Sequence, residues 1–347
     1  MKTNSGRIRI KDIAEMAGVS EGSVDRILHN RGKVSAKSEA KIRAVLEKIN
    51  YQPNRYASVL ALHKKYTIVC FIPQTEQNEY WTIVKSGIDK AMEEYQNLNI
   101  QLQWCFFNQF DKEDYTSKAK SIDIDANDAF LIVPTFEKEA SDLAQRIKNA
   151  GKQFALIDAQ LEDATPLCYY GQHALQSGRM VAELLLPTLK KQGSILLVRG
   201  SNELQNLIQR REAGFLDAIR HLAPQFDIET VNQLKDLSPI AEGLQQQRYV
   251  ACVVLNSRAW QIAKILHDNK IQLPIIGYDS IESNVKALQQ NQIYAIIGQR
   301  PASQGFRAFK SLAEYLLFNT LPQTVNYVPI DLLLRGNIDY YSDLYFG

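Results

Sequence analysis

Cysteine is scarce in this sequence of 347 residues, which contains four: Cys70, Cys105, Cys168 and Cys252. They are scattered through apolar, strand-like segments, and no two of them form a C-x-x-C pair. Isolated thiols in such surroundings predict small buried side chains rather than ligands or disulfide partners. We therefore expect a fold without disulfides and without a bound metal.

The sequence also lacks long apolar runs and the common catalytic motifs. No stretch approaches the roughly eighteen uninterrupted apolar residues of a membrane helix, and residues 1–6 carry no apolar signal-peptide core. G-x-G-x-x-G, G-x-x-x-x-G-K-[ST] and G-x-S-x-G are absent, and the five histidines are dispersed. These absences predict a cytoplasmic protein that is not an enzyme and uses no cofactor. A sugar kinase or dehydrogenase is the alternative.

Charge is divided unevenly along the chain. Residues 1–65 hold 14 Lys and Arg against 6 Asp and Glu, whereas the remainder holds 26 against 32. A basic head suits a polyanionic partner, and an acidic body favours solubility. At this length a small domain and a larger one can each bury a core.

Residues 10–28 predict two short helices joined by a tight turn. Apolar residues recur at helical spacing from Ile10 to Ala17. Gly18 is suited to a left-handed turn, and Ser20 is placed to cap the second helix. The pattern predicts a helix-turn-helix, whose second helix reads the DNA major groove. An ordinary helical hairpin is the alternative.

A third amphipathic helix follows Ser35, and a break at Tyr51–Arg55 precedes a short helical run that ends at Leu62. Here the chain closely resembles the lactose/galactose repressor family of bacterial transcription regulators. The matching residues are Lys11-Asp12-Ile13-Ala14, Ala17-Gly18-Val19-Ser20, Val24, Arg26, Val34-Ser35, Tyr51-Gln52-Pro53-Asn54-Arg55, Ala57 and Leu60. The resemblance implies an effector-controlled repressor, and two-fold symmetry of a homodimer predicts a pseudo-palindromic operator.

The first residues of the second helix are placed for base contacts. Glu21 can accept a hydrogen bond from cytosine or partner the helix dipole, and Ser23 can reach a phosphate or a base. The family more often has larger polar side chains at Glu21 and Gly22 and a serine at Asp25, so the operator sequence stays open. Phosphate contacts are expected from Lys11, Arg26, Arg31, Lys33 and Arg55. The full predicted DNA-binding set is Lys11, Ser20, Glu21, Gly22, Ser23, Asp25, Arg26, Arg31, Asn54, Arg55, Ala57 and Leu60.

The run after Pro53 is about nine residues long, too short to persist as an isolated helix. The resemblance implies a hinge helix that enters the minor groove, where Leu60 matches the leucine that opens a base step. A buried hinge residue is the alternative for Leu60.

From Tyr66 onward, strand-like and helical patterns alternate, which predicts parallel sheets wrapped by helices. The predicted strands are Thr67–Ile72, Ile100–Phe106, Ala129–Val133, Phe154–Asp158, Ser194–Val198, Ala251–Leu255, Ile275–Tyr278 and Ala295–Ile297. The predicted helices include Ile83–Tyr95, Glu137–Asn149, Ser177–Lys190, Arg210–Leu222, Arg258–Asn269 and Ala302–Leu317. The fold class is thus a small all-α helix-turn-helix domain plus an α/β body of two doubly wound parallel-sheet lobes.

The resemblance implies a periplasmic-sugar-binding-protein-like body (type I), in which the chain passes between the lobes three times. We place these crossings near Ala159–Gly178, Gly298–Pro301 and Pro322–Leu332. The predicted domains are 1–52 for DNA binding, 53–65 for hinge and linker, and 66–347 for effector binding. The N-lobe covers about 66–160 and 299–324, and the C-lobe about 175–297 and 330–347.

Polar and aromatic residues just past the strands are candidates for a ligand site in the cleft between the lobes. Carboxylates, amides and a guanidinium can bind vicinal hydroxyls, and an aromatic ring covers a sugar's C–H face. The predicted effector-binding set is Asn78, Tyr80, Trp81, Asp158, His173, Arg211, Asn256, Asp279 and Gln299. Core packing for the aromatics and helix capping for the aspartates are the alternatives.

His173 stands where the family usually has an aspartate that binds sugar hydroxyls, which puts an ordinary hexose or pentose in doubt. The sequence as a whole predicts a DNA-binding regulator, with operator DNA, a small molecule such as a sugar or sugar derivative, and a second copy of itself as partners. A plain sugar-binding protein on the same lobes is a further alternative.

Overall fold

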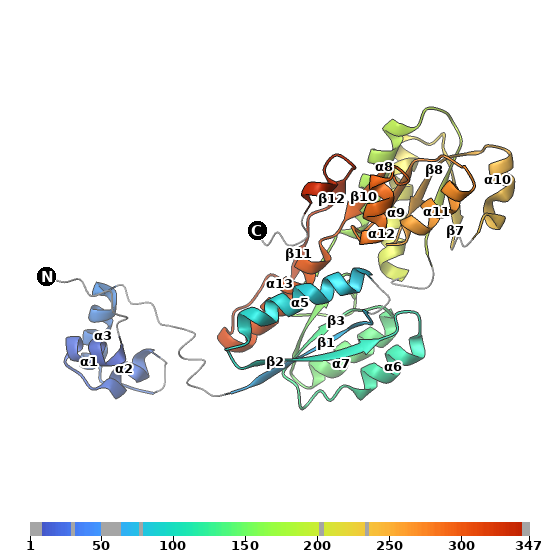
Figure 1. Ribbon diagram of the computed structural model, residues 1–347. Coiled ribbons are helices and arrows are strands. Elements are labelled where there is room, and N and C mark those ends of the chain that lie inside the picture. Colours follow the sequence, from blue (N-terminus) through green and yellow to red (C-terminus); the bar gives the residue numbers. More distant parts are fainter. Residues whose placement is uncertain are drawn as a thin grey trace. The chain divides into compact units, whose positions relative to one another are not determined.

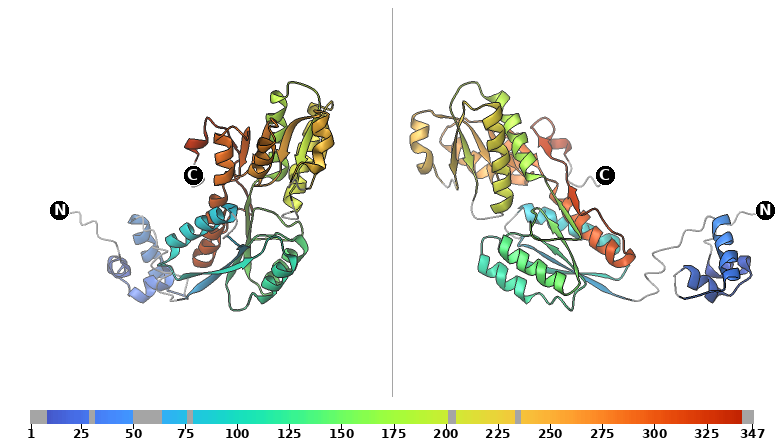
Figure 2. Two further views of the ribbon diagram at one scale, coloured as in Figure 1. Left: turned by 45° about the vertical axis from the view of Figure 1, so that its right-hand side comes forward. Right: turned by 180° about the vertical axis from the view of Figure 1, so that it is seen from behind.

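The computed structural model describes residues 9–28, 32–49, 64–75, 79–200, 205–232 and 236–341. The chain divides into two compact units, Met1–Leu62 and His63–Gly347. Each has its own hydrophobic core, and Figures 1 and 2 show the helices and strands of both. Within the described ranges, no helix is long and apolar enough to cross a membrane.

The first unit contains three described helices: α1 (Ile10–Ala17), α2 (Glu21–Leu28) and α3 (Ala36–Lys48). Gly18 ends α1 in the left-handed conformation, with φ of 60°. The Ser20 hydroxyl accepts a hydrogen bond from the Ser23 amide at 3.3 Å and so caps α2. Each helix contributes one fully buried side chain to a shared hydrophobic core: Ile13, Val24 and Ile42. The predicted helix-turn-helix geometry is therefore present.

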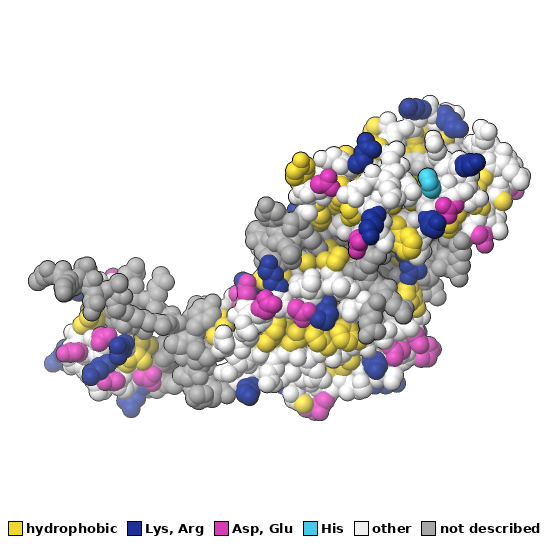
Figure 3. Space-filling model, viewed as in Figure 1, with side chains coloured by type: hydrophobic (Ala, Val, Ile, Leu, Met, Phe, Trp, Pro, Cys, Tyr) yellow, Lys and Arg dark blue, Asp and Glu magenta, His cyan; other side chains and the backbone are white. Residues whose placement is uncertain are grey.

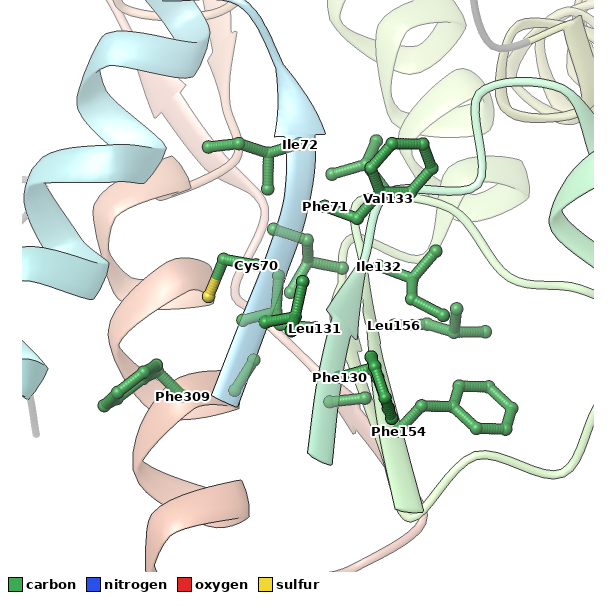
Figure 4. Close-up of a cluster of buried hydrophobic side chains, with 14 of the residues drawn as sticks. Cys70, Phe71, Ile72, Phe130, Leu131, Ile132, Val133, Phe154, Leu156 and Phe309 are labelled. Atoms are coloured by element: carbon green, nitrogen blue, oxygen red, sulfur yellow. The ribbon is translucent and has the colours of Figure 1, made fainter. Parts of the chain in front are cut away.

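The first lobe of the second unit is a six-stranded parallel sheet in the order β11-β5-β4-β3-β1-β2. Its strands are β1 (Tyr66–Pro73), β2 (Ile100–Phe107), β3 (Ala129–Ile132), β4 (Gln153–Ile157), β5 (Cys168–Gly171) and β11 (Val325–Tyr327). The helices are α5 (Glu79–Tyr95) and α13 (Pro301–Phe318) on one face, and α6 (Lys112–Ser121) and α7 (Glu137–Asn149) on the other (Figure 1). Figure 4 shows Cys70 of β1 turned toward Phe309 of α13, whereas Phe71 points to the opposite face. Both faces of the sheet are thus buried, as an apolar strand such as β1 requires.

The second lobe repeats the plan, in the order β12-β10-β9-β8-β6-β7. Its strands are β6 (Ser194–Val198), β7 (Asp227–Val231), β8 (Tyr249–Val254), β9 (Ile275–Tyr278), β10 (Ala295–Gly298) and β12 (Asp331–Leu333). All pairs are parallel except the pair of β12 with β10, which is antiparallel. One face packs on α8 (Ala174–Leu185) and α9 (Gln205–Leu222), and the other on α10 (Ala241–Gln245), α11 (Ala259–Asp268) and α12 (Glu282–Gln289). Short 3-10 turns occupy Leu186–Thr188, Ser238–Ile240 and Ile338–Tyr340.

The chain passes between the two sheets at three short segments, Gln172–His173, Gln299–Arg300 and Val328–Ile330. Each falls inside a range expected for a crossing. The crossings are narrower than predicted, because β5 and β11 belong to the first sheet rather than to the connecting segments. The first sheet therefore includes β5 and β11, which lie outside residues 66–160 and 299–324.

Every predicted strand, and every predicted helix within the described residues, is present, with ends shifted by a few residues. The predicted hinge helix after Pro53 lies outside the described residues. The strands β5, β7, β11 and β12 and the helices α6, α10 and α12 were not predicted. All four cysteines are free; three are buried and Cys105 is half-buried.

Candidate functional site

The outer face of α2 is the candidate DNA-reading surface. Glu21, Gly22 and Arg26 are exposed, whereas Val24 on the opposite side is buried. Ser23 is half-buried, and its hydroxyl lies 2.9 Å from the Ser20 hydroxyl in the cap. The helix therefore presents polar side chains outward from the three-helix core.

The other described members of the predicted DNA-binding set belong to α1, to the turn before α2 and to α2 itself. Lys11 and Ser20 are exposed, and Asp25 is half-buried on α2. Lys33 is exposed before α3. The remaining predictions lie outside the described residues: Arg31, Asn54, Arg55, Ala57 and Leu60, together with Asn78 of the effector-binding set.

A cavity between the two lobes brings together most of the predicted effector-binding residues. We call this cavity the inner cleft; it is lined by Tyr80, Trp81, Gln109, Asp158, Leu207, Ile208, Arg211, Asn256, Ser257, Asp279 and Gln299. Tyr80, Trp81 and Asp158 come from the first lobe, whereas the predicted residues Arg211, Asn256 and Asp279 come from the second and Gln299 from a crossing. Gln109, Leu207, Ile208 and Ser257 were not predicted.

The topology explains why residues so far apart in sequence meet here. Without the edge strands β11 and β12, five strands remain in each sheet. Counted along the chain within each sheet, they lie side by side in the order 2-1-3-4-5. Ligands of such sheets bind beyond the carboxyl ends of the strands. Asp158 directly follows β4, and Asp279 directly follows β9. Both have left-handed backbones, with φ of 70° and 74°, a conformation that aspartate tolerates better than most residues. These turns place the two carboxylates at the cleft.

The polar groups of the inner cleft are hydrogen-bonded to one another. The Tyr80 hydroxyl donates to Asp158 Oδ1 at 2.8 Å. Gln299 Nε2 donates to Asp279 Oδ1 at 2.5 Å. Trp81 Nε1 donates to Gln109 Oε1 at 2.8 Å, so this indole is both part of the core and held by a polar partner. The cleft is therefore lined by hydrogen-bond donors and acceptors that are paired with each other. The hydroxyl groups of a ligand can take the place of either partner.

Arg211 is the central cation of the cleft, and it is 2% exposed. Its Nη1 donates to the Leu255 carbonyl at 2.8 Å, and its Nη2 donates to Gln299 Oε1 at 2.6 Å. Its guanidinium lies 3.9 Å from the centre of the Tyr278 ring. Its Nε is buried without a hydrogen-bond partner among the described residues. A buried donor of this kind gains stability when a ligand oxygen reaches it.

Burial dominates the electrostatics of the cleft. It raises the pKa of Asp158 above the ordinary 3.8, although Arg211 and the Tyr80 hydroxyl favour the ionised form. Burial, together with the nearby Asp158 and Asp279 carboxylates, raises the pKa of Tyr80 well above its usual value. Tyr80 is therefore a hydrogen-bond donor at any physiological pH.

Two buried amides that the sequence did not single out hold the loops of the site in place. Asn284 of α12 is fully buried, and its Nδ2 donates to the carbonyls of Ser257, Tyr278 and Asp279 at 2.8–3.0 Å. Gln304 of α13 accepts from the Asp158 amide at 3.1 Å. Both lie within helices, so reading past the strand ends could not find them.

His173 does not join the inner cleft. It precedes α8, where its Nδ1 accepts from the Gln176 amide at 3.3 Å and caps the helix. Its ring lies 4.7 Å from that of Tyr327 and lines a separate small depression at the crossings. Helix capping thus holds His173 at a neighbouring depression rather than in the inner cleft, and its role in effector binding stays a prediction.

The inner cleft has a volume of about 40 Å³, which is room for a few water molecules. Drug-sized ligands occupy pockets of roughly 300–1,000 Å³. The hydrogen-bonded side chains fill the space, so a ring-sized ligand enters only when the lobes move apart or these pairs separate. Chemically, the site can bind a polyhydroxylated molecule in an enclosed space with aromatic cover.

A helix-turn-helix unit followed by a two-lobed parallel-sheet body with a polar cleft defines a class: bacterial transcription regulators with a ligand-binding body. The family comparisons agree. The periplasmic binding protein domain model matches residues 68–320, and the model of bacterial regulatory proteins, lacI family, matches residues 9–54. The chain belongs to the lacI family of bacterial regulatory proteins, and it is a DNA-binding transcriptional regulator.

Relatives span most of the chain. It is similar to the ribose operon repressor of Bacillus subtilis, 24% identical over 340 residues, which cover 94% of this chain and 97% of the relative. It is also similar to the sucrose operon repressor of Staphylococcus xylosus, 26% identical over 253 residues, or 71% and 73%. The crystal structure of a putative LacI transcriptional regulator from Bacteroides fragilis matches with a TM-score of 0.75 and 28% identity. That match covers 80% of this chain and all of the other.

Proposed function

We propose that this chain is a cytoplasmic repressor that binds operator DNA as a homodimer and changes its operator affinity when a neutral sugar occupies the inner cleft. The two relatives named for sugar operons support a sugar over other small molecules. Because both are repressors, we assign the cleft a binding role and no catalytic one.

The observation that carries the proposal is the set of paired polar groups contributed by both lobes. Asp158 and Asp279 supply acceptors, Arg211 supplies donors, and Gln299 supplies both. Two carboxylates against one guanidinium make the lining net acidic, which disfavours phosphorylated or acidic sugars. A neutral sugar whose hydroxyls replace these internal hydrogen bonds fits the site best.

The outer face of α2 supports the DNA-binding half of the proposal. Its exposed side chains include the cation Arg26, and Lys11 of α1 is exposed as well. We infer that Glu21, Gly22 and Ser23 face the bases, whereas Lys11 and Arg26 contact phosphates.

A hydrophobic stripe on the first lobe supports the homodimer. Leu102, Trp104 and Phe106 alternate along the edge strand β2, and all three are only half-buried. The Trp104 and Phe106 rings stack with centres 5.4 Å apart and planes 9° apart. Hydrophobic side chains gather in Figure 3 over the face where Figure 1 shows α5 and β2. An apolar surface of this kind is typical of the contact between two copies of a chain.

The proposed mechanism is a shift between two arrangements of the lobes. A sugar that binds one arrangement more tightly favours it, and the dimer then holds its two DNA-reading units in a different geometry. Coupling of this type typically changes the affinity for DNA by about 5–150-fold.

The test is footprinting of the full-length protein on the DNA upstream of its own gene, with and without each sugar of a panel. We expect a pseudo-palindromic footprint whose strength changes with at least one sugar. Arg211→Ala should keep the footprint and lose the response to the sugar, because the guanidinium spans Leu255 and Gln299 in the cleft. Arg335→Ala, at an exposed arginine of the second lobe, is the matched control and should respond as the wild type does.

Absence of protection on any DNA would contradict the operator half of the proposal. A normal sugar response in Arg211→Ala would move the effector site elsewhere.

A further inference from the structure

A second and larger cavity adjoins the inner cleft. We call it the outer cavity; it is lined by Phe110, Lys112, Glu113, Pro134, Thr135, Phe136, Glu137, Lys138, Glu139, Ala159, Gln160, Leu161, Asn206 and Leu207. Its volume is about 500 Å³, against about 40 Å³ for the inner cleft. Leu207 lines both cavities, so they lie on two sides of one side chain. A volume of roughly 300–1,000 Å³ is the usual size of a ligand pocket.

The outer cavity lies at the same edge of the first sheet as the inner cleft. Phe110 follows β2, the segment Pro134–Phe136 follows β3, and Ala159–Leu161 follows β4. The second lobe contributes Asn206 and Leu207 from α9. A molecule that extends out of the inner cleft past Leu207 therefore enters a space that residues of both lobes still line.

Aromatic rings and polar groups share this lining. Phe110 is 49% exposed, which is unusual for a phenylalanine, and Arg258 of the second lobe lies 4.8 Å from its ring centre. Asn206 Nδ2 lies 3.4 Å from Glu137 Oε1 across the two lobes, a long hydrogen bond that a ligand hydroxyl can replace. An exposed ring beside amides and carboxylates is the chemistry that holds a sugar.

Thr135 provides a second, independent indication. It is 5% exposed, and its hydroxyl is buried without a hydrogen-bond partner among the described residues. An unpaired buried hydroxyl costs free energy that a bound hydroxyl group can recover.

The charges of the outer cavity restrict the ligand further. Its lining holds the carboxylates Glu113, Glu137 and Glu139 against the ammonium groups Lys112 and Lys138. Lys112 and Glu139 already pair at 3.0 Å. Arg258 beside Phe110 balances the one remaining carboxylate, so the outer cavity has no net positive charge to attract a phosphate or carboxylate on the ligand.

We infer that the outer cavity is a second sugar subsite and that the effector is a neutral disaccharide or longer glycoside. One unit occupies the inner cleft, the linkage passes Leu207, and the next unit lies against Phe110. This inference rests on the proposed sugar effector of the inner cleft and names its class.

The experiment measures binding to the full-length protein by calorimetry. The monosaccharide probes are glucose, galactose, fructose and xylose, and the matched glycosides are maltose, cellobiose, sucrose, lactose, melibiose and xylobiose. At least one glycoside should bind about tenfold more tightly than either of its component sugars.

Two variants then test the outer subsite. Phe110→Ala should weaken glycoside binding about tenfold and leave monosaccharide binding unchanged. Thr135→Val should weaken the glycoside alone without lowering the melting temperature, because the hydroxyl has no partner within the protein. Leu222→Ala, which removes another exposed hydrophobic side chain, is the matched control and should change neither affinity.

Each contrary result has its own meaning. If a component sugar binds as tightly as every glycoside and Phe110→Ala alters nothing, the outer subsite is refuted while the sugar effector stands. Equal weakening of both ligands by Phe110→Ala would also refute it, because Phe110 would then act on lobe closure. If no saccharide binds the wild type, the proposed sugar effector itself is refuted, and the outer subsite with it.

Discussion

At the scale of single residues, two aspartates fix the chemistry of the cleft through their backbones. Asp158 and Asp279 each take a left-handed conformation at the end of a strand, where it costs roughly 1–2 kcal/mol for most residues. The Asp158 amide offsets part of this cost by donating to the Tyr170 carbonyl at 3.0 Å and to Gln304 Oε1. Strain retained at such a place is typical of functional sites.

The raised pKa of Asp158 leads to a prediction with opposite signs for stability and for binding. Between the ordinary value of 3.8 and the raised pKa, the folded protein holds a proton that the unfolded chain releases. The stability contributed by this group is therefore full below 3.8 and is lost as pH rises through the raised pKa. Sugar binding should instead weaken as pH falls, because a protonated carboxyl accepts fewer hydrogen bonds.

Scanning calorimetry measures the stability and titration calorimetry measures the sugar affinity. Both are applied to the wild type and to Asp158→Asn from about pH 7.5 down to about pH 4. The difference between the two proteins isolates the group, and Asp158→Asn should lack the acid loss of affinity. Parallel pH profiles for the two proteins would show that another residue titrates.

Reading past the strand ends found the residues of the cleft that begin loops, such as Asp158, Asn256 and Asp279. It failed for Asn284 and Gln304, because a buried polar residue inside a helix looks like any surface polar residue in the sequence. It did not place His173 outside the inner cleft, because helix capping and ligand binding require the same position before a helix. Sequence reasoning locates such a site but not the residues that brace it.

At the scale of helices and strands, two glycines let α8 and α9 pack closely, and this close packing determines where Arg211 of α9 lies. A Cβ atom on Gly178 of α8 would stand 1.9 Å from the Arg211 carbonyl oxygen, so α8 and α9 touch backbone to backbone. Gly214 of α9 makes the same approach to Leu175. The position of the Arg211 guanidinium therefore depends on Gly178 and Gly214, which have no side chain to hold α8 and α9 apart.

Gly178→Ala should destabilise the body by about 1–3 kcal/mol, because backbone on the facing helix cannot yield to a methyl group. It should also weaken sugar binding by displacing Arg211. Urea unfolding of the full-length protein measures the first effect, with Gly336→Ala as control, since a Cβ there meets nothing within 4 Å. Equal urea midpoints for the two variants would contradict the backbone-contact argument.

Several of the elements missed by sequence reasoning have a weak apolar signal, whereas β5 was missed although its four residues are buried. The strand β7 lies at a sheet edge and has no fully buried residue, and β11 and β12 have three residues each. In α6 only Tyr115 and Ala119 are buried, so its helical periodicity is faint. Long buried strands such as β1 are predictable, because both faces must be apolar.

At the scale of the whole molecule, the described hydrophobic clusters belong to one unit or the other. The three-helix core around Ile13 and Ile42 contains no residue of the body. The body should therefore fold without the DNA-reading unit.

Removal of residues 1–62 should abolish operator binding, whereas the remaining body should still be stabilised by the sugar and should still have the mass of a dimer. Saturation at 100 times Kd would stabilise it by about 2.7 kcal/mol. Gel shift, thermal melting and sedimentation, each with the full-length protein in parallel, measure the three properties. Retained operator affinity, or a monomeric body beside a dimeric full-length protein, would show that the units do not divide the tasks in this way.

The three crossings between the lobes are tied to one another. Gln172 Nε2 donates to the Gly298 carbonyl at 3.0 Å, and Arg300 binds Asp331 through two contacts of 2.7 and 2.9 Å. Three short connections held together in this way permit rotation of one lobe relative to the other and oppose translation. We therefore expect every ligand that fits the cleft to favour the same rotation, whatever its chemistry. Ligand specificity can then change through substitutions in the cleft lining without a change in the motion that reaches the DNA-reading unit.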